Sequence, residues 1–135
     1  MGGPNAGPEE YVLKKIAILE RQMLQIDTEL EGRRKDHERI TTAFANAKAM
    51  YTAALTDEEA LQRLSLGTDY TERVQRMHQI IRGVNNGLFD EIRTYKAFLK
   101  SLNAERRLLE REVSLLRLRI EYLGAGTYRD QINER

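Results

Sequence analysis

The apolar residues of this chain recur in alternating steps of three and four over two long stretches, and this pattern restricts the fold more than any other feature. From Val74 to Leu123 the repeat runs through seven heptads without interruption. A mean step of about 3.5 residues keeps one apolar stripe facing a neighbouring helix, as in a coiled coil. We therefore expect an all-α fold of long helices.

The first stretch follows the same frame from Val12 to Ala54, with Ile16 at position a. Positions a and d of both stretches form the seam along which helices pack against each other. The predicted seam residues are Ile16, Leu19, Met23, Ile26, Leu30, Ile40, Phe44, Ile81, Asn85, Leu88, Ile92, Tyr95, Leu99, Leu102, Leu109, Val113, Leu116, Ile120 and Leu123.

The breaks in this pattern divide the chain into five segments. Two long helices are expected, with a connector between them that contains a short helix and with polar segments outside them. The expected segments are a flexible N-terminal segment at 1–7, helix one at 8–55, the connector at 56–69, helix two at 70–123 and a polar C-terminal tail at 124–135.

Capping residues support these boundaries. Thr56, followed three residues later by Glu59, predicts a capping box at the start of a short helix that extends to about residue 64. Asp69 offers a second cap before helix two. The sequence Gly124-Ala125-Gly126 predicts the end of helix two, because glycine favours helix termination.

One segment inside helix two opposes the helical pattern. Gly83-Val84-Asn85-Asn86-Gly87 is typical of a turn, and each glycine costs about 1 kcal/mol inside a helix. Ile81, Asn85 and Leu88 nevertheless stay in the heptad frame across it. A continuous but weak helix is one interpretation, and a kink or break is the other.

Two seams joined by a short connector can fold back on each other as an antiparallel helical hairpin. Contacting residues would then have numbers that sum to about 125, which places His37 opposite Leu88. The alternative is that the chain stays extended and each seam pairs with another molecule.

A second apolar stripe predicts a partner interface. Leu108, Leu115 and Tyr122 share heptad position c, with Leu118 beside them at f. A helix that is apolar on two faces is normally packed against more than one neighbour. Leu13, Ile18 and Leu24 of helix one also lie off its seam. We expect packing in a dimer or a larger helical assembly, although isolated surface leucines are common.

Polar residues in the seam have a structural explanation. A polar residue such as Asn85 at position a usually specifies register or oligomeric state. His37 and His78 could suggest a metal site, but bundle sites use a Glu-x-x-His pattern. Arg34 and Gln75 stand three residues before the two histidines, so that pattern is absent. We predict no metal site.

Basic residues gather in the middle of the chain, although the net charge is only +1. They could bind an acidic protein surface or nucleic acid, or simply form a solvated face of alternating charge. The predicted acidic-partner residues are Arg33, Arg34, Lys35, Arg39, Arg73 and Arg76.

Several functional classes find no support. The chain has no cysteine, no phosphate-binding glycine loop and no nucleophile elbow. We therefore expect no catalytic residues, no cofactor and no enzymatic activity. No apolar run approaches the roughly 20 residues of a membrane span, and no secretory signal is recognisable. An intracellular location is expected, cytoplasmic or cytoskeletal, with the nucleus as an alternative.

These observations favour a structural or scaffolding coiled-coil protein. Such a protein bridges or spaces other proteins by helix packing, as a homo-oligomer or as a subunit of a larger assembly, for example a cytoskeletal one. The alternative is a binding module whose Arg-rich region holds an acidic protein surface or nucleic acid.

Overall fold

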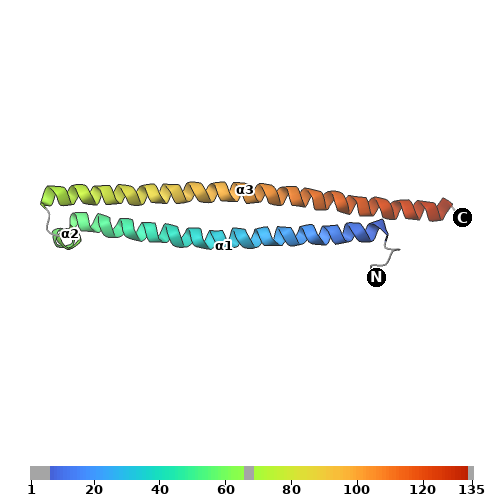
Figure 1. Cartoon of the computed structure of the whole chain (residues 1–135), viewed down its shortest axis with the longest axis horizontal. Helices are drawn as coiled ribbons and strands as arrows, with labels where there is room; N and C mark the ends of the chain where they lie inside the picture. The colour runs from blue at the N-terminus through green and yellow to red at the C-terminus, as the bar shows by residue number, and fades with distance from the viewer. Residues whose placement is uncertain (1–6, 66–68, 134–135) are drawn as a thin grey trace. The chain divides into compact units, whose positions relative to one another are not determined.

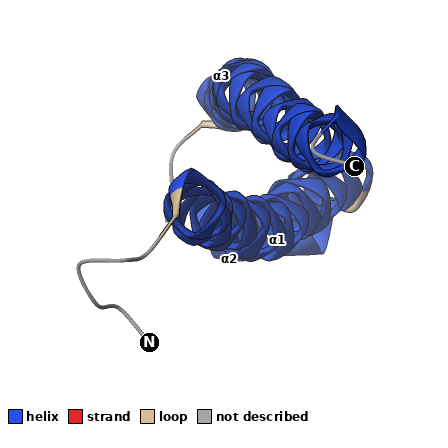
Figure 2. Ribbon diagram, turned by 90° about the vertical axis from the view of Figure 1, so that its right-hand side faces the viewer, coloured by secondary structure: helices blue, strands red, loops and turns tan. Residues whose placement is uncertain are grey.

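A computed structural model describes the backbone of residues 7–65 and 69–133 and the side chains of residues 7–63 and 69–124. Three helices follow one another in these ranges: α1 (Pro8–Thr56), α2 (Glu58–Ser65) and α3 (Tyr70–Asn133) (Figure 1). Figure 2 shows no strand in the described part of the chain. The predicted all-α class is confirmed, as are two long helices joined by a short helical connector. None of the described helices is long and apolar enough to cross a membrane.

The junction between α1 and α2 uses a different cap from the predicted one. The Thr56 hydroxyl donates to the Ala53 carbonyl at 2.9 Å, so it belongs to the last turn of α1. The Asp57 carboxylate instead accepts hydrogen bonds from the backbone N–H groups of Glu59 (3.0 Å) and Ala60 (3.3 Å). The prediction of Thr56 as N-cap is wrong, because Asp57 satisfies the free N–H groups at the start of α2.

The start of α3 agrees with the predicted cap. The Asp69 carboxylate accepts from the Thr71 N–H at 3.0 Å, and α3 begins at Tyr70. The helix is continuous through Gly83–Gly87, so a break at this segment is excluded. The helix can continue there because the seam residues on either side of the glycines keep the heptad spacing.

The end of α3 differs from the prediction. The helix extends to Asn133, so the predicted stop at Leu123 and the separate polar tail at 124–135 are wrong for the backbone up to 133. Gly124 does not adopt the left-handed conformation that a helix-ending glycine uses. Each glycine costs about 1 kcal/mol without forbidding a helix, and the next residues can propagate the helix once it is formed.

The chain divides into two compact units. Unit 1 comprises residues 1–30 and 99–135, and unit 2 comprises residues 31–98. Unit 1 therefore contains the first part of α1 and the later part of α3. Unit 2 contains the rest of both helices together with α2.

The apolar core of unit 1 forms where α1 contacts α3. Val12, Ile16 and Leu19 of α1 and Val113 of α3 are buried together. Half-buried residues pack around them, namely Met23, Leu109, Leu116 and Ile120. All eight residues occupy a or d positions, so the heptad repeat selects the side chains that meet in this unit.

In unit 2, complete burial is concentrated near α2. Ala54, Leu61 and Met77 have at most 1% of their surface exposed, and each belongs to a different helix. His78, which the heptad frame places at position a, is exposed instead. Near the start of α3, the buried position is therefore Met77 and not the adjacent His78. Burial of Met77 avoids the cost of desolvating an imidazole.

The pairing of helices in unit 2 also differs from the predicted register. The rings of His37 and Tyr95 stack with centroids 4.0 Å apart, and Glu91 accepts a hydrogen bond from His37 Nδ1 at 3.2 Å. The prediction that His37 lies opposite Leu88 is therefore wrong by up to seven residues. The His37–Tyr95 stack and the His37–Glu91 hydrogen bond favour this register. A register predicted by counting equal numbers of residues from the connector cannot take such contacts into account.

Gly87 permits a close approach between α1 and α3 in unit 2. A Cβ atom at this position would lie 2.7 Å from Cε1 and 2.8 Å from Cζ of Phe44. Carbon atoms normally pack about 3.5–4.0 Å apart, so a side chain at position 87 would require the Phe44 ring to move. The glycine that opposes helix formation in the sequence is thus explained by helix packing.

Candidate protein-binding surfaces

The predicted seam residues lie where helices pack. Ile16, Leu19, Ile26 and Val113 are buried, and all the other predicted seam residues are half-buried. Asn85 is among the half-buried residues. The seam residues are therefore occupied by contacts within each unit, and surfaces for other proteins have to be sought elsewhere.

The residues predicted for a partner interface are exposed. Leu108, Leu115, Leu118 and Tyr122 each have more than half of their surface accessible. They belong to the part of α3 that lies in unit 1. Exposed apolar side chains in such number are unusual on one segment of a monomer and mark a candidate interaction site.

An ion pair shows which of these residues share one side of unit 1. Lys15 Nζ lies 3.7 Å from Glu112 Oε1, so these two residues bridge α1 and α3. Side chains three and four residues away lie on the same helix face. Tyr11 and Ile18 therefore flank Lys15, just as Leu108 and Leu115 flank Glu112.

We name this surface the c face and define it as Tyr11, Ile18, Leu108, Leu115 and Tyr122, around the Lys15–Glu112 pair. All five apolar residues occupy heptad position c and are exposed. The sequence reasoning noted Ile18 as an apolar residue off the seam but missed Tyr11 and the surface that the two share with α3. A count of apolar residues at position c in both helices would have found Tyr11 and Ile18 together.

Three other exposed apolar residues of unit 1 lie off the c face. Leu118 occupies position f, which points away from the seam. Leu13 and Leu24 occupy positions e and b on the opposite side of α1. Leu118 lies three residues after Leu115 and four before Tyr122, so it borders the c stripe but points farther from the ion pair of the c face. Its part in a partner interface stays a prediction.

The opposite side of unit 1 is held by charged contacts. Arg117 pairs with Glu20 at 2.5 Å, and Arg106 pairs with Asp27 at 2.7 Å across the two helices. Arg106 also contacts Glu110. The hydrogen bond from Arg106 lowers the pKa of the Asp27 carboxyl below its usual value. Arg106, at a seam position, thus has carboxylate partners and is not a free surface charge.

Three of the six predicted acidic-partner residues have carboxylate partners. Arg33 is half-buried and lies 2.7 Å from Glu91. Arg34 pairs with Glu31 at 2.6 Å and with Glu38 at 2.5 Å. Arg39 pairs with Asp36 at 3.0 Å. Neutralised cations attract an acidic partner less strongly than free ones, so these contacts weaken the case for this surface.

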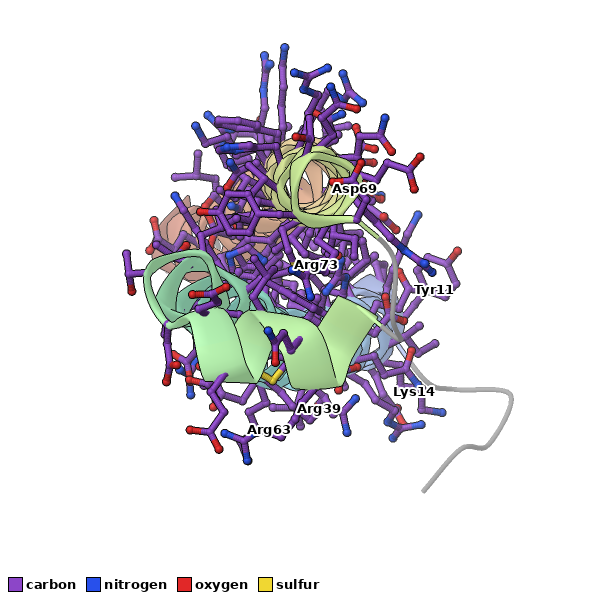
Figure 3. All side chains as sticks on the ribbon, turned by 90° about the vertical axis from the view of Figure 1, so that its left-hand side faces the viewer. Tyr11, Lys14, Arg39, Arg63, Asp69 and Arg73 are labelled. Carbon is purple, nitrogen blue, oxygen red and sulfur yellow. The ribbon has the colours of Figure 1, made fainter. Side chains whose placement is uncertain are left out.

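The remaining predicted basic residues are Lys35, Arg73 and Arg76. Lys35 and Arg76 are exposed. Arg73 is half-buried, with its guanidinium 5.8 Å from the centre of the Tyr70 ring. Figure 3 shows Arg73 on the side of α3 that faces α2, whereas Arg63 lies on the far side of α2. Arg73 is therefore poorly placed to hold an external ligand.

No group of three or more His, Cys, Asp or Glu side chains that could hold a metal ion occurs among the described residues. Comparison of the chain with protein families, with curated proteins and with solved structures found no match. The candidate sites are therefore judged on their geometry alone, and on that basis the c face is the strongest.

Proposed function

We propose that this chain is a non-enzymatic scaffolding protein that bridges or spaces other protein chains by helix packing, as a subunit of a larger assembly. In this proposal α1 and α3 close on each other within one chain as an antiparallel hairpin. The seam is then satisfied internally, and the c face is the surface that binds. A cytoplasmic or cytoskeletal assembly is the setting that suits such a helical spacer.

The observation that carries this proposal is the contrast between the two sides of unit 1. The c face exposes five apolar side chains around one ion pair. The opposite side is linked by Glu20–Arg117 and by Asp27–Arg106. Five exposed apolar residues gather on the c face, whereas the opposite side exposes two, Leu13 and Leu24. Such a gathering is typical of a protein interface, since its burial is favourable only when a partner covers it.

The contacts within each unit support closure inside a single chain. Lys15–Glu112 and Asp27–Arg106 join α1 to α3 in unit 1, and Arg33–Glu91 joins them in unit 2. From Glu20–Arg117 through Asp27–Arg106 to Arg33–Glu91, the residue number rises along α1 and falls along α3. This is the order that an antiparallel pair requires.

The alternative function, binding of an acidic protein surface or nucleic acid, has less support. Arg33, Arg34 and Arg39 all have carboxylate partners within the chain. An acidic ligand would have to compete with these carboxylates for each guanidinium, which lowers the gain from binding.

The two functions differ in their response to salt and to substitution. The tagged chain would be used to capture proteins from cell extract at low and at high ionic strength. We expect capture that persists at high salt and that is lost in the Ile18→Glu/Leu115→Glu variant. The Leu13→Glu/Leu118→Glu variant is the matched control, because its residues have similar exposure but lie off the c face.

Capture that falls steeply with salt would instead favour the acidic partner, as would its loss in Lys35→Glu/Arg76→Glu. Equal capture by the c-face variant and by its matched control would contradict the proposed function.

A further inference from the structure

We propose that the c face binds the c face of a second copy of this chain, so that α1 and α3 of two unit 1 regions form a four-helix bundle. The proposal rests on the proposed function and names the partner for the same surface. In this dimer a twofold axis runs parallel to the helices of unit 1. Each α1 then lies over α3 of the second copy, and every helix has antiparallel neighbours.

The arrangement of the apolar residues suits this symmetry. α1 contributes two exposed apolar residues to the c face, Tyr11 and Ile18, and α3 contributes three at the same seven-residue spacing. The twofold axis places the shorter stripe of one copy against the longer stripe of the other. Because both copies carry both stripes, the two α1 residues and two of the three α3 residues of each copy gain an apolar neighbour from the second copy.

The charges of the c face are also complementary to themselves. Lys15 and Glu112 lie side by side in one copy, with side chains that are about half exposed. Rotation about the proposed axis places Lys15 opposite Glu112 of the second copy and Glu112 opposite Lys15 of the second copy. Four alternating charges then meet at the centre, so neither charge is left unpaired when water is removed.

The available area matches the needs of a stable dimer. More than half of each of the five apolar side chains is exposed. Their burial would remove roughly 600 Å² per copy from water, or about 1,200 Å² in total, before any polar neighbour is counted. This total reaches the lower end of specific interfaces, which bury about 1,200–2,000 Å².

A second copy supplies both the apolar stripes and the complementary charges that the c face requires. A different helix would need an apolar stripe of matching spacing, together with an acid and a base at the two correct positions. The chain already carries both on the surface in question. This self-complementarity is the reason for choosing a second copy over an unrelated partner.

The first experiment measures the mass of the purified full-length chain by sedimentation velocity over a concentration series. We expect a dimer of twice the chain mass of 15.7 kDa. Leu115→Glu should weaken dimerisation by at least about 100-fold, because the change places two charges in the centre of the interface. Leu118→Glu should weaken it far less, since residues 115 and 118 are 58% and 59% exposed but only Leu115 occupies position c.

A matched pair on α1 repeats the comparison. Ile18 and Leu13 are 53% and 51% exposed, and only Ile18 belongs to the c face. Ile18→Glu should therefore weaken the dimer, whereas Leu13→Glu should not. Circular dichroism of all four variants would show that helix content is retained. A lower mass in sedimentation can then be attributed to loss of the dimer interface.

Cysteine cross-linking tests the orientation directly, because the chain contains no cysteine of its own. A mixture of Ile18→Cys and Leu115→Cys chains should form a mixed disulfide dimer under mild oxidation. A mixture of Leu13→Cys and Leu118→Cys chains should not. Equal cross-linking in both mixtures would overturn the proposed orientation.

The outcomes also separate this proposal from the proposed function. A purified chain that stays monomeric at every concentration overturns the dimer. If that monomer still captures another protein through the c face at high salt, the scaffolding function stands with a different partner. A dimer that survives both Ile18→Glu and Leu115→Glu overturns the c face as its interface.

Discussion

Alanine at Gly87 should destabilise the protein, although alanine at a glycine inside a helix is ordinarily stabilising by about 1 kcal/mol. The added methyl carbon would lie 2.7 Å from Phe44 Cε1, whereas ordinary carbon contacts are about 3.5–4.0 Å. Gly83 is the matched control, because it lies in the same helix and a Cβ atom there meets nothing within 4 Å.

The magnitude follows from two opposing effects. Alanine at either position gains about 1 kcal/mol of helix propensity. Overpacking at Gly87 typically costs about 1–3 kcal/mol, and the cost is moderated because Phe44 is half-buried and its ring can move. Gly83→Ala should therefore raise the free energy of unfolding by about 1 kcal/mol. Gly87→Ala should change it by between about 0 and −2 kcal/mol.

Urea denaturation followed by circular dichroism at a single protein concentration measures both variants. A double-mutant cycle with Phe44→Leu isolates the contact, since a shorter side chain leaves room for the methyl group. In that background Gly87→Ala should become as stabilising as Gly83→Ala. Equal stabilisation by the two alanines in the wild-type background would refute the close packing of Gly87 on Phe44.

Three further predictions test local contacts. Asp57→Ala should lower the free energy of unfolding by about 1 kcal/mol in urea denaturation, and Thr56→Ala by clearly less, because Asp57 caps α2. Burial raises the pKa of Glu91, but hydrogen bonds from Arg33 and His37 outweigh it and hold the pKa below 4.5. Glu91 therefore stabilises the fold above about pH 4.5 and loses this effect as pH falls through its lowered pKa, so Glu91→Gln should make acid unfolding less steep. Asp27→Arg should destabilise the chain, and Asp27→Arg/Arg106→Asp should recover part of the loss in the same assay, since the pair joins α1 to α3. If Asp27 and Arg106 did not interact, the second substitution would add its own loss of stability to that of the first.

The helices themselves could be predicted because helix formation depends on local periodicity. The heptad frame identified the buried residues of both long helices except Met77, which is buried in place of His78. It was less reliable at helix ends, where Thr56 and Gly124 were assigned roles that depend on one or two hydrogen bonds. Which of these hydrogen bonds forms depends on the neighbouring groups in the folded chain, and the residue type alone does not reveal these neighbours.

The candidate site was only half visible in the sequence. The α3 stripe of Leu108, Leu115 and Tyr122 could be found from its spacing alone. That Tyr11 and Ile18 belong to the same surface depends on the contact between Lys15 and Glu112, two residues 97 positions apart. Contacts of this kind leave no periodic signal.

The sequence by itself determined that the chain forms long helices with one continuous apolar seam, because that property follows from the repeat of side chains around a single helix. Only the tertiary structure decided the register of α1 against α3. The His37–Tyr95 stack, the Arg106–Asp27 pair and the fit of Phe44 over Gly87 each require two distant segments to meet. The heptad repeat is compatible with several registers, and these specific contacts distinguish one of them from the rest.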